Sequence, residues 1–87
     1  MKAGAYSRQQ IANAFGATLR EIRREQGVSQ EALSEACDFD RTYPSLLERG
    51  LRHPTLRMLL RLSDALHLEP ERLLIETVAR LRKEACT

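Results

Sequence analysis

The stretch from Gly27 to Pro54, GVSQEALSEACDFDRTYPSLLERGLRHP, constrains the fold most, because two helices must begin and end within it. Ser29 can cap the first of these helices through its side-chain oxygen. The apolar positions of that helix then recur every three or four residues, at Ala32, Leu33, Ala36 and Cys37. Asp40 can cap the second helix, and Gly50 can end it in the left-handed conformation. The stretch therefore predicts two short helices, Ser29–Cys37 and Asp40–Arg49, joined by a tight turn.

Capping signals predict three further helices. Ser7 is followed three residues later by Gln10, the spacing of a capping box, so a first helix should begin at Arg8. Gly27 should end that helix. The two remaining helices are expected to open after Pro54 and at Pro70.

Composition agrees with an all-α domain. Of the 87 residues, 43% are apolar, which is enough for one core, and the small number of Gly, Pro and aromatic residues disfavours a sheet. We expect a flexible amino-terminal tail over 1–7, one folded domain over 8–75 and a helical extension over 76–87.

The last helix carries more apolar residues than a domain of this size needs. Leu73 and Leu74 should finish the core. Ile75, Val78 and Leu81 continue an apolar line beyond it, and such a stripe commonly marks an interface, so we assign these three residues to a homodimer contact. The alternative is that the end of the helix folds back on the first helix.

Charge is distributed unevenly around the two short helices. Residues 29–40 hold four acidic residues and no Lys or Arg, whereas residues 41–61 hold five arginines against Glu48 alone. Such a basic concentration suits a surface that faces phosphates, although a solvated helical face would have the same composition.

Nothing in the sequence predicts export or membrane insertion. Residues 1–8 are polar, and charges interrupt every window long enough to span a bilayer. Cys37 and Cys86 lie far apart without metal-type spacing, which suits reduced thiols in the cytoplasm.

The segment REIRREQGVSQEALSEACDFDRTYPSLLERGLRHPTLRMLLRLSDALHL resembles the Cro/repressor-type (XRE-like) helix-turn-helix domain of phage repressors and bacterial regulators. The most specific parts are VSQEALSEA, the LLERG ending and the helix HPTLRMLLRLSDAL, in this order. The resemblance implies a compact five-helix lambda-repressor-like domain that binds double-stranded operator DNA as a two-fold dimer. It implies no cofactor.

The resemblance also implies roles for individual residues. The positions that match base-reading residues of the family are Arg41, Thr42, Ser45 and Leu46. Those that match phosphate-contacting positions, or suit such contact beside them, are Gln30, Tyr43, Arg49, Arg52 and His53. Arg23 and Glu48 match an ion pair that ties the first helix to the third. Arg41 is the best candidate for base readout, because a guanidinium can bridge O6 and N7 of guanine; the alternative is that Arg41 is simply solvated.

Two positions depart from the family pattern. Pro44 stands where the family usually has an aliphatic residue, and it predicts that the recognition helix effectively begins near Tyr43, which would change where Arg41 and Thr42 point. Asp38 stands where glycine is common, and aspartate tolerates left-handed geometry better than most residues.

These features predict a sequence-specific DNA-binding transcriptional regulator, and a repressor rather than an activator. The alternative is an antitoxin or another protein-interaction module, with a small protein partner on the Ile75–Leu81 line and secondary DNA binding. We do not expect an enzyme, because the chain has no Gly-rich phosphate loop, no metal-ligand spacing and no plausible catalytic triad.

Overall fold

The computed structural model describes residues 6–85, which form five helices and no strand. The helices are α1 (Arg8–Glu25), α2 (Gln30–Cys37), α3 (Tyr43–Glu48), α4 (Leu56–Ala65) and α5 (Pro70–Ala85). The all-α prediction is confirmed. Cys86 and most of the expected amino-terminal tail lie outside the described residues.

The start of α1 follows its capping signal. The Ser7 hydroxyl accepts a hydrogen bond from the Gln10 N–H at 3.0 Å, and the Gln10 side chain accepts one from the Ser7 N–H at 2.7 Å. Both bonds of the predicted capping box are therefore present, and they satisfy two N–H groups at the helix start that have no partner within the helix.

One apolar core joins all five helices. The long helix α1 contributes side chains from its middle and its end. Each of the other helices contributes one or two apolar side chains that are almost fully buried. The core consists of Phe15, Leu19, Ile22, Leu33, Cys37, Leu47, Leu62, Leu66 and Leu73. Leu74, which was also expected in the core, is exposed instead.

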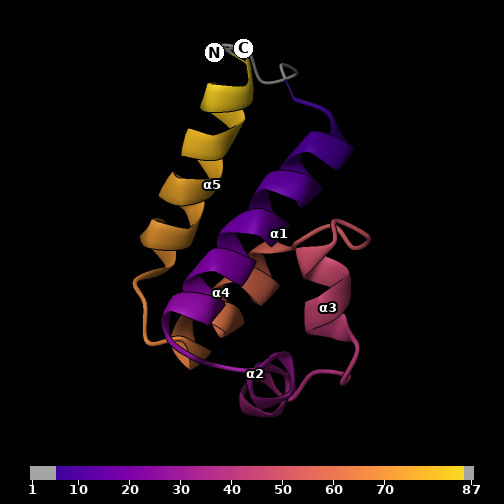
Figure 1. The fold of residues 1–87 in the computed structure, drawn as a ribbon, viewed down its shortest axis with the longest axis vertical. Helices are drawn as coiled ribbons and strands as arrows, with labels where there is room; N and C mark the ends of the chain where they lie inside the picture. Colours follow the sequence, from indigo (N-terminus) through magenta and orange to yellow (C-terminus); the bar gives the residue numbers. More distant parts are fainter. Residues whose placement is uncertain (1–5, 86–87) are drawn as a thin grey trace.

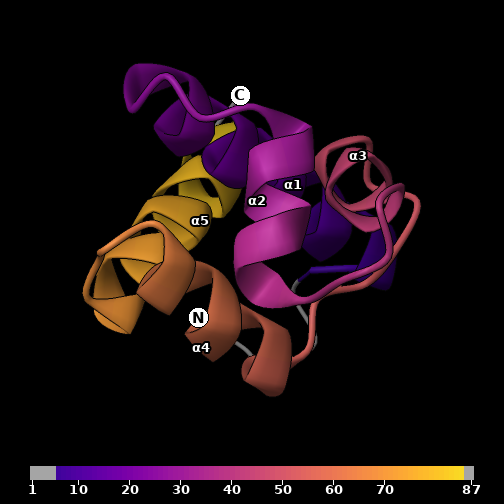
Figure 2. The same cartoon turned by 90° about the horizontal axis from the view of Figure 1, so that it is seen from below.

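Helix α2 closes one end of the molecule. Seen from below, it lies between α3 and α4, and it packs against both of them (Figure 2). Its buried residues Leu33 and Cys37 point into the core, so the opposite face of α2 is left to solvent. The α2–turn–α3 unit is therefore at the surface while it remains anchored from beneath.

Helix α5 lies alongside α1 for most of its length (Figure 1). Leu81 is only 5% exposed, so it is buried within the chain, whereas Ile75 is 65% exposed and Val78 is half-buried. The assignment of Leu81 to a dimer contact is therefore wrong, because this side chain is buried within its own chain. The second half of α5 folds back on α1, which was the alternative, because its buried stripe is Leu73, Thr77 and Leu81.

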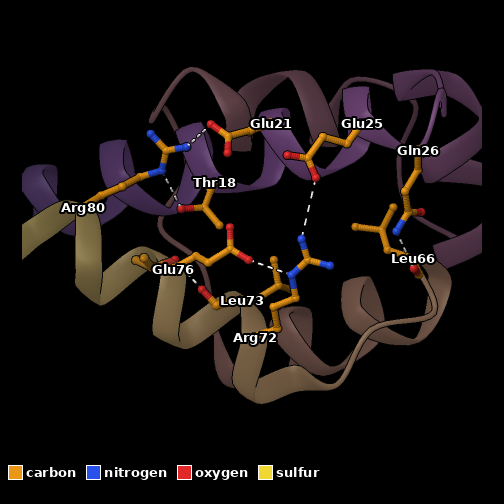
Figure 3. Close-up of polar contacts among 10 residues, drawn as sticks. Thr18, Glu21, Glu25, Gln26, Leu66, Arg72, Leu73, Glu76 and Arg80 are labelled. Atoms are coloured by element: carbon orange, nitrogen blue, oxygen red, sulfur yellow. Dashed lines mark hydrogen bonds and ion pairs between the residues drawn. The ribbon is translucent and has the colours of Figure 1, made fainter.

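Polar contacts line the edge of this α1–α5 contact (Figure 3). The Arg80 guanidinium donates to the Thr18 hydroxyl at 3.0 Å and to the Glu21 carboxylate at 2.6 Å. Arg72 pairs with Glu76 at 2.7 Å on its own helix and with Glu25 of α1 at 3.6 Å. Exposed pairs of this kind contribute little, so the buried stripe supplies most of the attraction between the helices.

Gly16 permits a close approach of α1 to α3. A Cβ at this position would overlap the carbonyl oxygen of Leu47 and would lie 2.8 Å from that of Glu48. Both carbonyls belong to the end of α3, so the missing side chain lets α3 pack directly on the backbone of α1.

We predict that Gly16→Ala destabilises the protein by about 1–3 kcal/mol, because the added methyl group overpacks this contact. Helix propensity alone predicts the opposite sign, a gain of about 1 kcal/mol. The matched control is Ala79→Gly at an exposed position of α5, where alanine should be the more stable residue by about 1 kcal/mol. Urea unfolding of both variants checks this, and a stabilised Gly16→Ala protein would contradict it.

Candidate nucleic-acid interface

The connection between α2 and α3 is built on a left-handed residue. Asp38 has φ 56° and ψ 44°, and its N–H donates to the Glu35 carbonyl. The Phe39 N–H donates back to the Ser34 carbonyl at 2.9 Å. Aspartate therefore ends α2 in the geometry that usually requires glycine, as predicted for this position.

Helix α3 begins at Tyr43, as predicted from Pro44. The range Asp40–Arg49 predicted from the capping signals is corrected to Tyr43–Glu48. Pro44 occupies the first turn of α3 and is fully buried. Asp40 lies outside the helix and accepts two hydrogen bonds on Oδ1, from the Thr42 N–H at 2.9 Å and from the Thr42 hydroxyl at 2.8 Å. The bond from the Thr42 backbone and then that from its hydroxyl lower the pKa of Asp40 below its ordinary value.

The four predicted base-reading residues are consequently placed differently from one another. Arg41 and Thr42 lie in the turn before α3 and are exposed, whereas Ser45 and Leu46 lie on the helix and are half-buried. The Thr42 hydroxyl donates its proton to Asp40. The Arg41 side chain is exposed, and its guanidinium forms an ion pair with Glu31.

A polar depression of about 460 Å³ opens at the amino end of α2. It brings together three predicted contact residues, Gln30, Ser45 and Arg49, with two arginines of α1, Arg20 and Arg24. The sequence analysis did not single out those two arginines as contact residues. Their i, i+4 spacing at the end of α1, one loop away from the start of α2, is the signal that could have identified them.

The Arg23–Glu48 ion pair is present and largely buried. The guanidinium donates from Nε to Glu48 Oε2 at 2.6 Å and from Nη2 to Oε1 at 2.9 Å, and the side chains are 11% and 3% exposed. Nη1 donates to the Val28 carbonyl at 2.8 Å. The Gln30 amide donates to Glu48 Oε1 at 3.0 Å, so this side chain also belongs to the ion-pair network. Hydrogen bonding to Glu48 raises the pKa of Arg23 further above its ordinary value.

The remaining predicted phosphate contacts vary in exposure. The Tyr43 ring packs edge-on against Phe39, with ring centroids 5.3 Å apart, rather than lying free at the helix flank. Arg49 and Arg52 are exposed. His53 is half-buried, and within residues 6–85 its Nδ1 has no hydrogen-bond partner.

The described residues hold no cluster of metal-ligating side chains. Residues 6–85 contain no group of three or more His, Cys, Asp or Glu that could hold a metal ion. In the same part of the chain, every helix is too short or too polar to cross a bilayer.

Comparison with known proteins agrees with this geometry. A family model described as "Helix-turn-helix domain" matches residues 14–74, which include the whole α2–turn–α3 unit. The chain belongs to the helix-turn-helix family. Its members are DNA-binding transcription regulators, and the resemblance to the Cro/repressor-type (XRE-like) group is confirmed.

Several characterised helix-turn-helix proteins are similar to this one. Control protein C.BamHI of Bacillus amyloliquefaciens is 43% identical over 61 residues, which are 69% of this chain and 75% of that protein. The structure of the restriction-modification controller protein C.AhdI from Aeromonas hydrophila matches with a TM-score of 0.69 and 42% identity, covering 71% of this chain and 94% of that one. The clp gene regulator ClgR from Corynebacterium glutamicum matches with a TM-score of 0.81 and 32% identity, covering 87% and 81%. The predicted lambda-repressor-like five-helix fold is confirmed.

We predict that the Arg23–Glu48 pair is strongly coupled. Arg23→Met alone should lower the free energy of unfolding by about 3–5 kcal/mol, because it leaves the Glu48 carboxylate buried without its cation. The double variant Arg23→Met/Glu48→Leu should lose clearly less, because it leaves no buried charge. Urea unfolding of both single variants and the double variant measures the coupling.

Additive losses would contradict this prediction. If a single variant is too unstable to fold, the double variant must still fold for the predicted coupling to hold.

Proposed function

We propose that this protein is a sequence-specific DNA-binding regulator that acts as a homodimer on a pseudo-palindromic operator. The observation that carries the proposal is the surface formed by the α2–turn–α3 unit. Arg41 is exposed in the turn before α3, and the arginine-lined depression lies at the start of α2. We further propose that it acts as a repressor, because occupying an operator is the simplest act that such a domain performs.

Charge on this surface supports DNA as the partner. Glu48, the one acidic residue among five arginines over residues 41–61, is nearly buried and paired with Arg23. Arg20, Arg24 and Arg49 add positive charge around the amino end of α2, where helix N–H groups favour a phosphate. In the proposed complex these arginines hold the DNA backbone, and Arg41, with Ser45 and Leu46 beside it, reads base edges.

A second surface supports the homodimer. Leu56 of α4 is 74% exposed, and Leu74 of α5 is 55% exposed. An apolar depression of about 240 Å³ between α1, α4 and α5 is lined by both leucines. Leu60 lies one turn after Leu56 and Ile75 follows Leu74, and both are exposed. We define these four residues, Leu56, Leu60, Leu74 and Ile75, as the α4–α5 patch, and we propose that a second copy covers it.

This patch revises the predicted dimer contact. Ile75 remains in it, and Val78 is half-buried one turn after Leu74. Leu81 is removed because it is buried against the chain itself. Apolar patches of this kind are typical of protein interfaces.

Selection of bound sites from a pool of random DNA tests the function. We expect a palindromic site whose half-sites lie about one DNA turn apart, near 34 Å. Affinity for that site should fall steeply with salt, because each neutralised phosphate releases counterions. Recovery of no preferred sequence would overturn sequence-specific regulation.

We predict that Leu74→Glu disrupts the homodimer, because it places charge within an apolar contact. Sedimentation should show a monomer, and affinity for the selected palindrome should fall towards that of a single half-site. The control for sedimentation is Leu51→Glu, because Leu51 is also 55% exposed but lies in the loop after α3. A wild-type protein that is already monomeric would instead favour a different protein, such as a toxin, on the α4–α5 patch.

A further inference from the structure

Arg41 does not extend freely into solvent. Its guanidinium Nη2 lies 3.5 Å from Oε2 of Glu31, and the two side chains are 79% and 59% exposed. Glu31 belongs to the first turn of α2, whereas Arg41 belongs to the turn before α3, so the contact links two separate elements.

The contact lies over a depression of about 470 Å³ that is acidic on its α2 side. The depression is lined by Glu31, Ser34, Glu35, Asp38, Phe39 and Arg41. Arg41 is thus the one cationic side chain among three carboxylates in this lining. An arginine with these neighbours is attracted towards α2.

The backbone beneath Arg41 is firmly held. Asp40 is bonded to the Thr42 N–H and hydroxyl, and Tyr43 donates its N–H to the Asp40 carbonyl at 3.0 Å. Phe39 packs against the Tyr43 ring and beneath the Arg61 guanidinium, which lies 5.2 Å from the Phe39 ring centroid. The direction of the Arg41 side chain is therefore decided mainly by its own torsions and by Glu31.

A guanidinium can serve a carboxylate and a guanine at the same time. It presents five N–H donors in a planar fork, and a bidentate contact to O6 and N7 of guanine uses only two of them. A contact between Arg41 and a DNA phosphate is different, because it brings that phosphate towards the negative charge of Glu31. Glu31 therefore interacts favourably with one bound state and unfavourably with the other.

We propose that Glu31 is a specificity-determining residue that acts through Arg41: it holds the guanidinium so that its remaining donors face a guanine, and it disfavours contact of Arg41 with phosphates. This role rests on the proposed function. Glu31 is a positioning residue, because no base contact of its own is required.

The test compares affinities for the selected operator and for a scrambled site of equal length, at one salt concentration. Glu31→Gln should lower the ratio of these affinities by about threefold or more, since exposed pairs shift an equilibrium by roughly this factor. Arg41→Gln should lower the ratio by about fivefold to 150-fold, the range for loss of a bidentate base contact. In the Arg41→Gln background, Glu31→Gln should leave the ratio unchanged.

Glu35→Gln is the matched control. Glu35 lines the same depression on the same helix, but the ion pair of Arg41 is with Glu31 and not with Glu35. Removing the Glu35 charge should raise both affinities by a similar factor and keep their ratio. Thermal unfolding confirms that each variant is folded.

The outcomes separate this proposal from the function on which it rests. If Glu31→Gln changes both affinities by the same factor, as Glu35→Gln does, the role of Glu31 is overturned while DNA binding stands. The role is also overturned if the effect of Glu31→Gln on the ratio persists without Arg41. If the wild-type protein prefers no sequence, the proposed function itself fails.

Discussion

The carboxylate of Glu48 is the point at which three segments of this protein meet. Arg23 brings the end of α1 to it, and the same guanidinium also holds the Val28 carbonyl in the loop before α2. Gln30 adds the first turn of α2. Desolvation offsets much of the attraction within such a pair, so its contribution is geometric more than energetic. This matters because α3 has only six residues, far too few for a helix that is stable by itself. Its position is imposed by α1, through the Arg23–Glu48 ion pair and through the direct backbone contact at Gly16.

Pro44 gives the interface its particular form. Without an N–H it cannot continue a helix towards its amino end at ordinary cost, and its buried ring fills the place of an aliphatic side chain. The chain before it therefore turns, and Asp40 stabilises that turn by accepting from Thr42. Arg41 leaves the protein from a fixed turn rather than from a helical surface. In the proposed complex, the direction from which Arg41 approaches DNA therefore depends on the geometry of this turn.

The sequence predicted most of the fold because the decisive signals are local. Each of these features involves only residues close together in the chain, and each is found where the sequence predicted it. They are the capping box at Ser7, the cap at Ser29 and the left-handed conformation of Asp38. What the sequence missed depends on packing at a distance. Thr77 is polar, so it interrupted the apolar stripe of α5 and moved the predicted contact to Ile75, Val78 and Leu81. In the structure Thr77 is buried with its hydroxyl donating to the Leu73 carbonyl at 2.7 Å, which removes the cost of burying it. The sequence pattern does not indicate whether the Thr77 hydroxyl bonds to the Leu73 carbonyl or to water.

One face of α5 packs against the rest of the chain, and a different face carries the proposed dimer contact. Leu73, Thr77 and Leu81 are used for contact with the rest of the chain, so this stripe is unavailable to a partner. Leu74 and Ile75 lie on the remaining surface of the helix, and Leu74 lines an apolar depression together with Leu56 of α4. Covering the α4–α5 patch therefore requires no rearrangement of the core. Because α5 is fixed on α1, and α1 fixes α3 through Arg23 and Gly16, the spacing of two α3 helices in such a dimer would follow from rigid packing alone. A variant that binds half-sites at a different spacing would then have to be altered in the α4–α5 patch, and not in the turn before α3.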